Sequence, residues 1–276
     1  MAKLAGKSKR ADQRSKTMIT HFTSKAQADA YQAPPPAVPW KTLGIITFLL
    51  VSLFAGYRYY QELTSFSVGL DYFEPEFQIY WMNLLYTQLV IEALVFFGLV
   101  GYLWKTRDKN VLQVTAQEEL RRYYVLLCCI VGFSVISYLA ASLYTEADAA
   151  WHQVTVRDTD FTPTHIALFY FGIPTFIILG VSTFVYAHTR LPQFHNRVSA
   201  GLALLVAGPI LIMPNLGFNE WGHTFFYAEE LFAAPVHWGF VLLGWSAFAA
   251  GGFLIQIITR MITLSSLDGD QKVVEA

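Results

Sequence analysis

Two stretches of this sequence combine one carboxylate or amide side chain with two histidines at a spacing that suits metal binding. In the first stretch, Asp148 and His152 are four residues apart, and His165 follows thirteen residues later. Residues four apart share one face of an α-helix, so Asp148 and His152 would point the same way. One carboxylate and two imidazoles suit copper, zinc or iron. The first stretch therefore predicts a site for a first-row transition metal.

The second stretch repeats this arrangement with an amide in place of the carboxylate. Asn219 and His223 are again four apart, and His237 follows fourteen residues later. In both stretches the last histidine comes two residues after a proline. Because the asparagine carries no charge, we expect the second site to hold a divalent metal more weakly than the first.

The composition places these residues in a membrane protein. Of the 276 residues, 54% are apolar and only 14% are charged, whereas about 25% are charged in an ordinary soluble domain. A soluble fold of this length cannot bury so much apolar surface. A membrane helix needs about 20 mostly apolar residues, so we predict an all-α, polytopic membrane bundle with about six transmembrane helices. The predicted spans are approximately 42–60, 79–104, 123–144, 163–188, 198–213 and 234–262.

Charges in the loops between these spans alternate in sign. The basic segments are 1–41, 105–122 and 188–197, and the acidic segments are 62–76, 146–160 and 219–230. By the positive-inside rule, both termini are predicted to be cytoplasmic and both histidine stretches to lie on the outer side. The net charge of −1 provides no basic field for nucleic acid. The predicted domains are a basic tail with a proline-rich linker (1–41), a transmembrane domain (42–262) and a C-terminal tail (263–276).

The histidines have a simpler interpretation that must be weighed against metal binding. Thr162 and Pro163 are typical of a helix start, which puts His165 in a first helical turn. A single histidine at such a place is most often a hydrogen-bonded interface residue. Polar groups inside a membrane are costly and usually functional, which favours ligands when both sets are taken together. Glu92, in the middle of the second span, is interpreted as a structural hydrogen-bond partner, a proton relay or a contact with another subunit.

At these residues the sequence resembles a known family. The segments WHQVTVRDTDFTPTHI (151–166) and PNLGFNEWGHTFFYAEELFAAPVHWGF (214–240) closely resemble the C subunit of the copper membrane monooxygenases, as do AHTRLP and GYLWKTRDKN. These enzymes include particulate methane monooxygenase, ammonia monooxygenase and related short-alkane enzymes. The resemblance runs from about Gly69 to Arg260.

The resemblance implies a copper-dependent oxidase in a bacterial inner or intracytoplasmic membrane. Its A and B subunits would be this chain's partners in a trimer of heterotrimers. The enzyme would use O2, a small apolar substrate, and quinol or another electron donor. In that family the C subunit binds copper at two neighbouring sites. The matching positions here are Asp148, His152 and His165 for one site and Asn219, His223 and His237 for the other. The segment 69–87 is more similar to the methane and hydrocarbon branch, so methane or a short alkane is predicted as substrate, with ammonia as the alternative.

Within this hypothesis the Asn219 set is the catalytic one, and the Asp148 set holds its copper more firmly. A rival hypothesis is a metal-ion or proton-coupled membrane transporter, which six spans, outer histidines and Glu92 would also suit. Internal pseudo-symmetry with broken helices would support a transporter. A third hypothesis is a bis-histidine haem protein for quinol oxidation, which needs histidines that face each other within spans.

Overall fold

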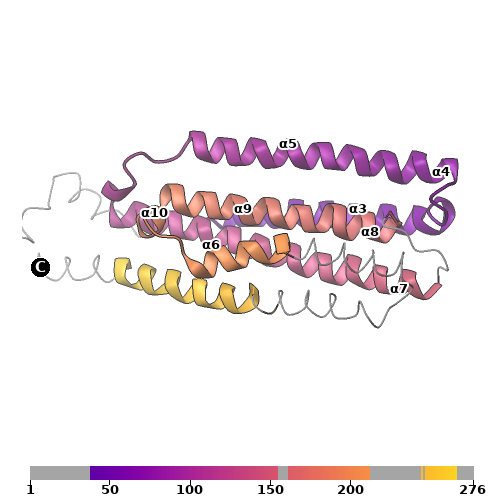
Figure 1. The fold of residues 1–276 in the computed structure, drawn as a ribbon. Helices are drawn as coiled ribbons and strands as arrows, with labels where there is room; N and C mark the ends of the chain where they lie inside the picture. Colours follow the sequence, from indigo (N-terminus) through magenta and orange to yellow (C-terminus); the bar gives the residue numbers. More distant parts are fainter. Residues whose placement is uncertain (1–37, 155–160, 212–243, 245, 266–276) are drawn as a thin grey trace, which may run out of the picture.

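The computed structural model of the chain is an elongated bundle in which long helices run side by side (Figure 1). It describes residues 38–154, 161–211, 244 and 246–265. Within these ranges the chain forms helices and turns and contains no β-strand. The predicted all-α class is therefore confirmed.

Five helical stretches are long and apolar enough to cross a membrane: Trp40–Val68, Pro75–Lys105, Ala116–Asp148, Pro163–Arg190 and Ser246–Ser265. Three of them are continuous runs that pass from α-helix into a short π-helix and back. The labelled elements are α3 (Trp40–Val68), α4 (Pro75–Phe77), η1 (Gln78–Met82), α5 (Asn83–Lys105), η2 (Val111–Gln113), α6 (Ala116–Leu139), η3 (Ala140–Thr145), α7 (Glu146–Val154), α8 (Pro163–Ala167), η4 (Leu168–Gly172), α9 (Ile173–Arg190) and α10 (Pro192–His195).

The described helices agree closely with the predicted spans. A shorter apolar helix, Ala200–Leu211, occupies most of the predicted fifth span. Five long helices and this short one compare well with the prediction of about six. The predicted sixth span, 234–262, is described only at 244 and from 246 onward.

Two helices extend beyond their apolar runs into polar segments. In α3, Thr64 Oγ1 and Ser65 Oγ donate to the carbonyls of Tyr60 and Gln61, 2.7 Å away in each case. Both are bonds to the i−4 carbonyl within the helix, which satisfy the two hydroxyls in this polar segment. At the start of α6, the side chain of Thr115 accepts a hydrogen bond from the backbone N–H of Glu118. Thr-x-x-Glu is the sequence of a capping box, so the earlier start of this helix could be read from the sequence.

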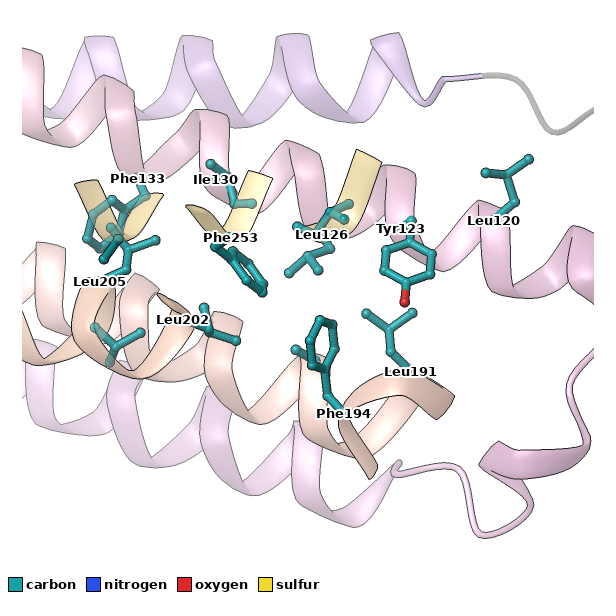
Figure 2. Close-up of a cluster of buried hydrophobic side chains, with 14 of the residues drawn as sticks. Leu120, Tyr123, Leu126, Ile130, Phe133, Leu191, Phe194, Leu202, Leu205 and Phe253 are labelled. Carbon is teal, nitrogen blue, oxygen red and sulfur yellow. The ribbon is translucent and has the colours of Figure 1, made fainter. Parts of the chain in front are cut away.

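The largest buried cluster joins helices that are far apart in the sequence (Figure 2). It includes Tyr123 and Phe133 of α6, Phe194 of α10, Leu202 and Phe253. Close approach is possible because Gly201 has no side chain: a Cβ there would lie 3.1 Å from the carbonyl oxygen of Ala249 and 3.2 Å from Phe253. This cluster fixes the helix Ala200–Leu211 against Ser246–Ser265.

Different elements lie at the two ends of the bundle (Figure 1). At one end α4, α7 and α8 lie together, and we call it the histidine end because it carries Asp148 and His165. At the other end lie α10 and the loop after α5. We call this the arginine end because it carries several arginines, among them Arg122, Arg190, Arg197 and Arg260.

Large apolar side chains cover the outside of the bundle. They are dense on α3 and α5, where Phe48, Leu94 and Phe97 are each about 70% exposed. In water such a surface would drive aggregation, whereas lipid or partner helices cover it without cost. The exposed faces therefore agree with the membrane location.

Candidate metal centre

Asp148 lies just after a widened helical turn. The third long helix passes from α6 into the π-helix η3 and then into α7, which carries Asp148 and, four residues later, His152. π-helical turns inside α-helices are rare and often occur at functional sites. The two residues are on one helix, as their spacing predicted.

His165 is fixed in the first turn of α8 by the predicted helix start. Thr162 is the N-cap residue, and its Oγ1 accepts a hydrogen bond from the backbone N–H of His165 at 3.1 Å. Pro163 occupies the first position of the helix. The imidazole is only 1% exposed and stacks on Phe169, with ring centroids 4.7 Å apart. Its orientation is therefore set by both the backbone and an aromatic neighbour.

The structure brings Asp148 and His165 together. His165 Nε2 lies 3.4 Å from Asp148 Oδ1, and the Asp148 side chain is 18% exposed. Two ligand atoms that each lie about 2.1 Å from one metal ion are about 3.0–3.4 Å apart when the ligand–metal–ligand angle is between about 90° and the tetrahedral value. The observed separation therefore fits two ligands of one metal as well as a direct contact between the side chains.

The remaining predicted ligands are less fully described. His152 belongs to α7, but its side chain is outside the described part of the structure. Asn219, His223 and His237 all lie outside the described residues. Within the described ranges, no group of three or more His, Cys, Asp or Glu side chains is arranged to hold a metal ion. The structure thus places two donors, and the predicted sites as complete sets stay predictions.

A glutamine from another helix supports the His165 turn. Gln88 of α5 donates from Nε2 to the carbonyl oxygen of Ile166 at 3.3 Å, and its Oε1 accepts from the hydroxyl of Tyr57 at 2.8 Å. Ile166 follows His165 directly and is fully buried. Gln88 therefore ties α3, α5 and α8 together beside the imidazole. Sequence reasoning missed Gln88, because nothing local shows which carbonyl a mid-helix glutamine will meet.

Stacked aromatic rings fill the space between α3, η3 and η4. Phe54 and Tyr57 of α3 pack against Tyr144 and Phe171, with ring centroids 4.6–6.0 Å apart. The Tyr144 hydroxyl donates to the carbonyl oxygen of Phe54 at 2.9 Å. This packing joins α3 to the two π-helical segments η3 and η4.

Gly69 allows the end of α3 to lie against the start of α8. A Cβ at this position would be 2.6 Å from Pro163 Cγ, 2.6 Å from the carbonyl oxygen of Ser65 and 2.9 Å from Trp81 Nε1. No side chain fits there without displacing Pro163, two residues before His165. A small cavity of about 30 Å³ adjoins this contact, between Gly69, Trp151 and Thr162. It has room for a molecule about the size of water.

Glu92 lies one helical turn beyond Gln88 on α5. Its side chain is partly buried, and both carboxyl oxygens are shielded from solvent with no hydrogen-bond partner among the described residues. The structure therefore does not show the hydrogen-bond partner that was one of the three interpretations of Glu92. Its role as a relay or as a contact with another subunit stays a prediction.

Comparison with known proteins agrees with this picture. The chain is 24% identical over 164 residues to the NAD(P)H-quinone oxidoreductase chain 4 2 of Trichodesmium erythraeum (strain IMS101), which covers 46% of this chain. The chain matches only 29% of that relative's length, and identity at this level does not assign a family. A family model that describes the C subunit of ammonia monooxygenase/methane monooxygenase matches residues 23–268, which include every predicted ligand. The chain therefore belongs to the family of the C subunit of ammonia monooxygenase/methane monooxygenase, and its long apolar helices support a multi-pass membrane protein.

Proposed function

We propose that this chain is a copper-binding membrane subunit of a monooxygenase that hydroxylates methane or a short alkane with O2. Family membership supports the monooxygenase and favours it over a metal-ion or proton-coupled transporter. The observation that carries the copper proposal is the Asp148–His165 pair, with its buried imidazole and donor atoms 3.4 Å apart.

Copper would be held by Asp148, His152 and His165. The imidazole nitrogens suit copper, and the single carboxylate offsets part of its charge. A second copper would be held by Asn219, His223 and His237, which we propose as the catalytic set. When bound, copper would supply the redox chemistry that activates O2.

The chain's own residues would give this site its rigidity and dryness. Asp148 and His165 are donors on two different helices, so their separation depends on helix packing. Gln88 holds the His165 turn through the Ile166 carbonyl. The aromatic packing around Phe54 and Tyr144 excludes water, which protects a reactive site from side reactions.

The proposed assembly and orientation follow from the family and from the loop charges. We propose that the chain works with A and B subunits in a trimer of heterotrimers, with quinol or another reductant as electron donor. Both termini would be cytoplasmic, and the histidine end would face the outer side. Labelling of single cysteines in intact cells, at the loop after α5 and at the loop before α8, would test this orientation.

The first experiment is a copper count on the intact complex purified in native-like lipid. We compare the wild type with Asp148→Asn and His165→Ala, and use His195→Ala as the matched control because His195 is an exposed histidine at the arginine end. The site variants should lose about one copper per heterotrimer and most of the activity, and the control should lose neither. Full copper and full turnover in an assembled His165→Ala complex would overturn the proposal.

Substrate choice needs its own assay. Membranes that contain the complex should oxidise methane or a short alkane faster than ammonia at equal substrate concentrations. Faster oxidation of ammonia would leave the copper proposal standing and reverse the substrate proposal.

A further inference from the structure

Two adjoining hollows lie at the arginine end, at the opposite end of the bundle from Asp148 and His165. One, of about 420 Å³, lies between the segment 193–201 and the helix Ser246–Ser265. The other, of about 440 Å³, lies between α10 and Arg260. Both linings include Gln193 and Arg197, so the hollows form one continuous depression. We call it the arginine-end groove, and it is defined by Gln193, Arg197, Ala249, Gly252, Gln256 and Arg260.

The groove changes from apolar to cationic along one helix. Ala249, Gly252, Gln256 and Arg260 are three or four residues apart, so they lie along one face of Ser246–Ser265. At 1.5 Å per residue this face is about 16 Å long. Small apolar residues come first, then an amide, then a guanidinium. In a membrane helix this order places the apolar part toward the lipid interior and the cation toward the surface.

The apolar part of the groove is open because a side chain is missing. A Cβ added at Gly252 would meet nothing within 4 Å. The floor beneath is tightly packed: Phe194 and Phe253 have ring centroids 5.6 Å apart and belong to the buried cluster (Figure 2). The groove is therefore open at Gly252 and lies over a packed aromatic floor.

The polar part of the groove carries one positive charge that is not balanced by a carboxylate of the described residues. Arg260 is paired with the carboxylate of Glu119 through two contacts of 2.9 Å. Arg197 is exposed, and no ion pair to it occurs within the described part of the chain. Among the described residues, no carboxylate lines either hollow. Gln256 accepts from Ser199 Oγ at 2.9 Å through its Oε1, which leaves its amide nitrogen as a donor for a ligand.

We propose that the arginine-end groove binds an anionic phospholipid. Its phosphate would lie at Arg197 and the Gln256 amide, and one acyl chain would follow Ala249 and Gly252. A free phosphate would leave the apolar half uncovered, and a zwitterionic lipid would bring a second cation to Arg197. The proposal goes beyond the monooxygenase function and does not depend on copper or on the substrate.

The test is lipid binding to the delipidated complex, measured by native mass spectrometry. The probes are dioctanoyl phosphatidylglycerol, dioctanoyl phosphatidylcholine and glycerol 1-phosphate. The variants are Arg197→Gln at the polar end and Gly252→Leu at the apolar end. The matched controls are Arg107→Gln, whose arginine lies over the Trp104 ring outside the groove, and Gly98→Leu, at a glycine that is also open.

Phosphatidylglycerol should bind the wild type and the controls more tightly than the other two probes. Arg197→Gln should weaken that binding about fivefold, the typical effect of one basic residue near a membrane surface. Gly252→Leu should weaken it by blocking the acyl chain. Equal binding of phosphatidylcholine, equal binding of glycerol 1-phosphate, or effects no larger than those of the controls would each overturn the proposal. If one variant fails to assemble, the other variant and the probe series decide.

Discussion

The arginine end and the histidine end of the bundle are stabilised by different interactions. At the arginine end, Arg122 pairs with Asp108 at 2.8 Å and with Glu118 at 2.9 Å, and it also donates to the carbonyl oxygen of Arg190 at 2.7 Å. Arg190 in turn bonds Thr106 and the carbonyl oxygen of Leu103. Charges here join the helices α5, α6 and α9 and the loop after α5.

The histidine end depends on aromatic packing and on neutral hydrogen bonds instead. Arg58, a cation in that half of α3, bonds Gln61 and Glu62 on its own helix. The Asp148–His165 contact joins the two groups proposed as ligands. The difference teaches that arginines join the helices at one end, whereas at the other end the carboxylate of Asp148 and the imidazole of His165 contact each other and would be available to a cation under the copper proposal.

The largest stability effect is expected from Arg122→Ala. Its removal leaves Asp108 and Glu118 without their shared partner, and the loss of several charge-assisted hydrogen bonds together costs about 3 kcal/mol. Thermal unfolding and the yield of assembled complex measure this loss. Arg121→Ala is the control, because Arg121 is 65% exposed and pairs with the same Glu118, so it should cost under about 1 kcal/mol. Copper per assembled complex should stay at the wild-type value in both; copper loss in Arg122→Ala would contradict the separation of the two ends.

Gly69→Ala should affect both stability and copper. The added methyl overlaps Pro163 and the Ser65 carbonyl, and overpacking of this kind costs about 1–3 kcal/mol. Because Pro163 precedes His165 by two residues, copper content should also fall. Gly98→Ala is the matched control, since its Cβ meets nothing within 4 Å. A Gly69→Ala complex with normal copper would show that the α3–α8 contact does not position the imidazole.

Gln88→Met should have a smaller effect at the same end. The variant keeps the volume but leaves the Tyr57 hydroxyl and the Ile166 carbonyl without their partner, at a cost of about 1–2 kcal/mol. Copper affinity should fall without loss of assembly, which competition with a chelator would measure. Gln113→Met, at an exposed position in η2, should change neither quantity. Equal affinity in the two variants would make Gln88 a purely structural residue.

The smallest effect is a pH dependence at the arginine end. The Asn110 backbone N–H, with Arg122 and Arg190 nearby, lowers the pKa of Asp108 below its usual value. A carboxylate with a lowered folded-state pKa stabilises the fold above its unfolded pKa, about 3.9, and this stabilisation is lost as the pH falls through the folded pKa. Asp108→Asn should therefore have a lower melting temperature than the wild type at pH 6. The difference between the two melting temperatures should shrink as the pH falls below about 4, because the wild type then loses the same stabilisation. Glu76→Gln is the control, because Glu76 is an exposed carboxylate at the histidine end. If the melting temperature of Asp108→Asn depends on pH in the same way as that of the wild type, Asp108 does not contribute to the ion-pair network.

The sequence alone determined the membrane class, the approximate spans and the helix start at Thr162–Pro163, and it also encodes an earlier start at Thr115 than the predicted 123. These properties are local, because each depends on one stretch of chain. A span needs about 20 apolar residues, and the two helix starts depend on the Thr115 capping box and on Thr162–Pro163. The four-residue spacing of Asp148 and His152 placed both on α7 for the same reason.

Only the tertiary structure decided which side chains meet across helices. Gln88 reaches a carbonyl 78 residues away, and Gly69 meets Pro163. Neither contact leaves a local pattern, because it depends on how two helices are rotated and shifted against each other. The same holds for the 3.4 Å between Asp148 and His165. Helical periodicity predicts which residues share a face, and packing alone sets which faces come into contact.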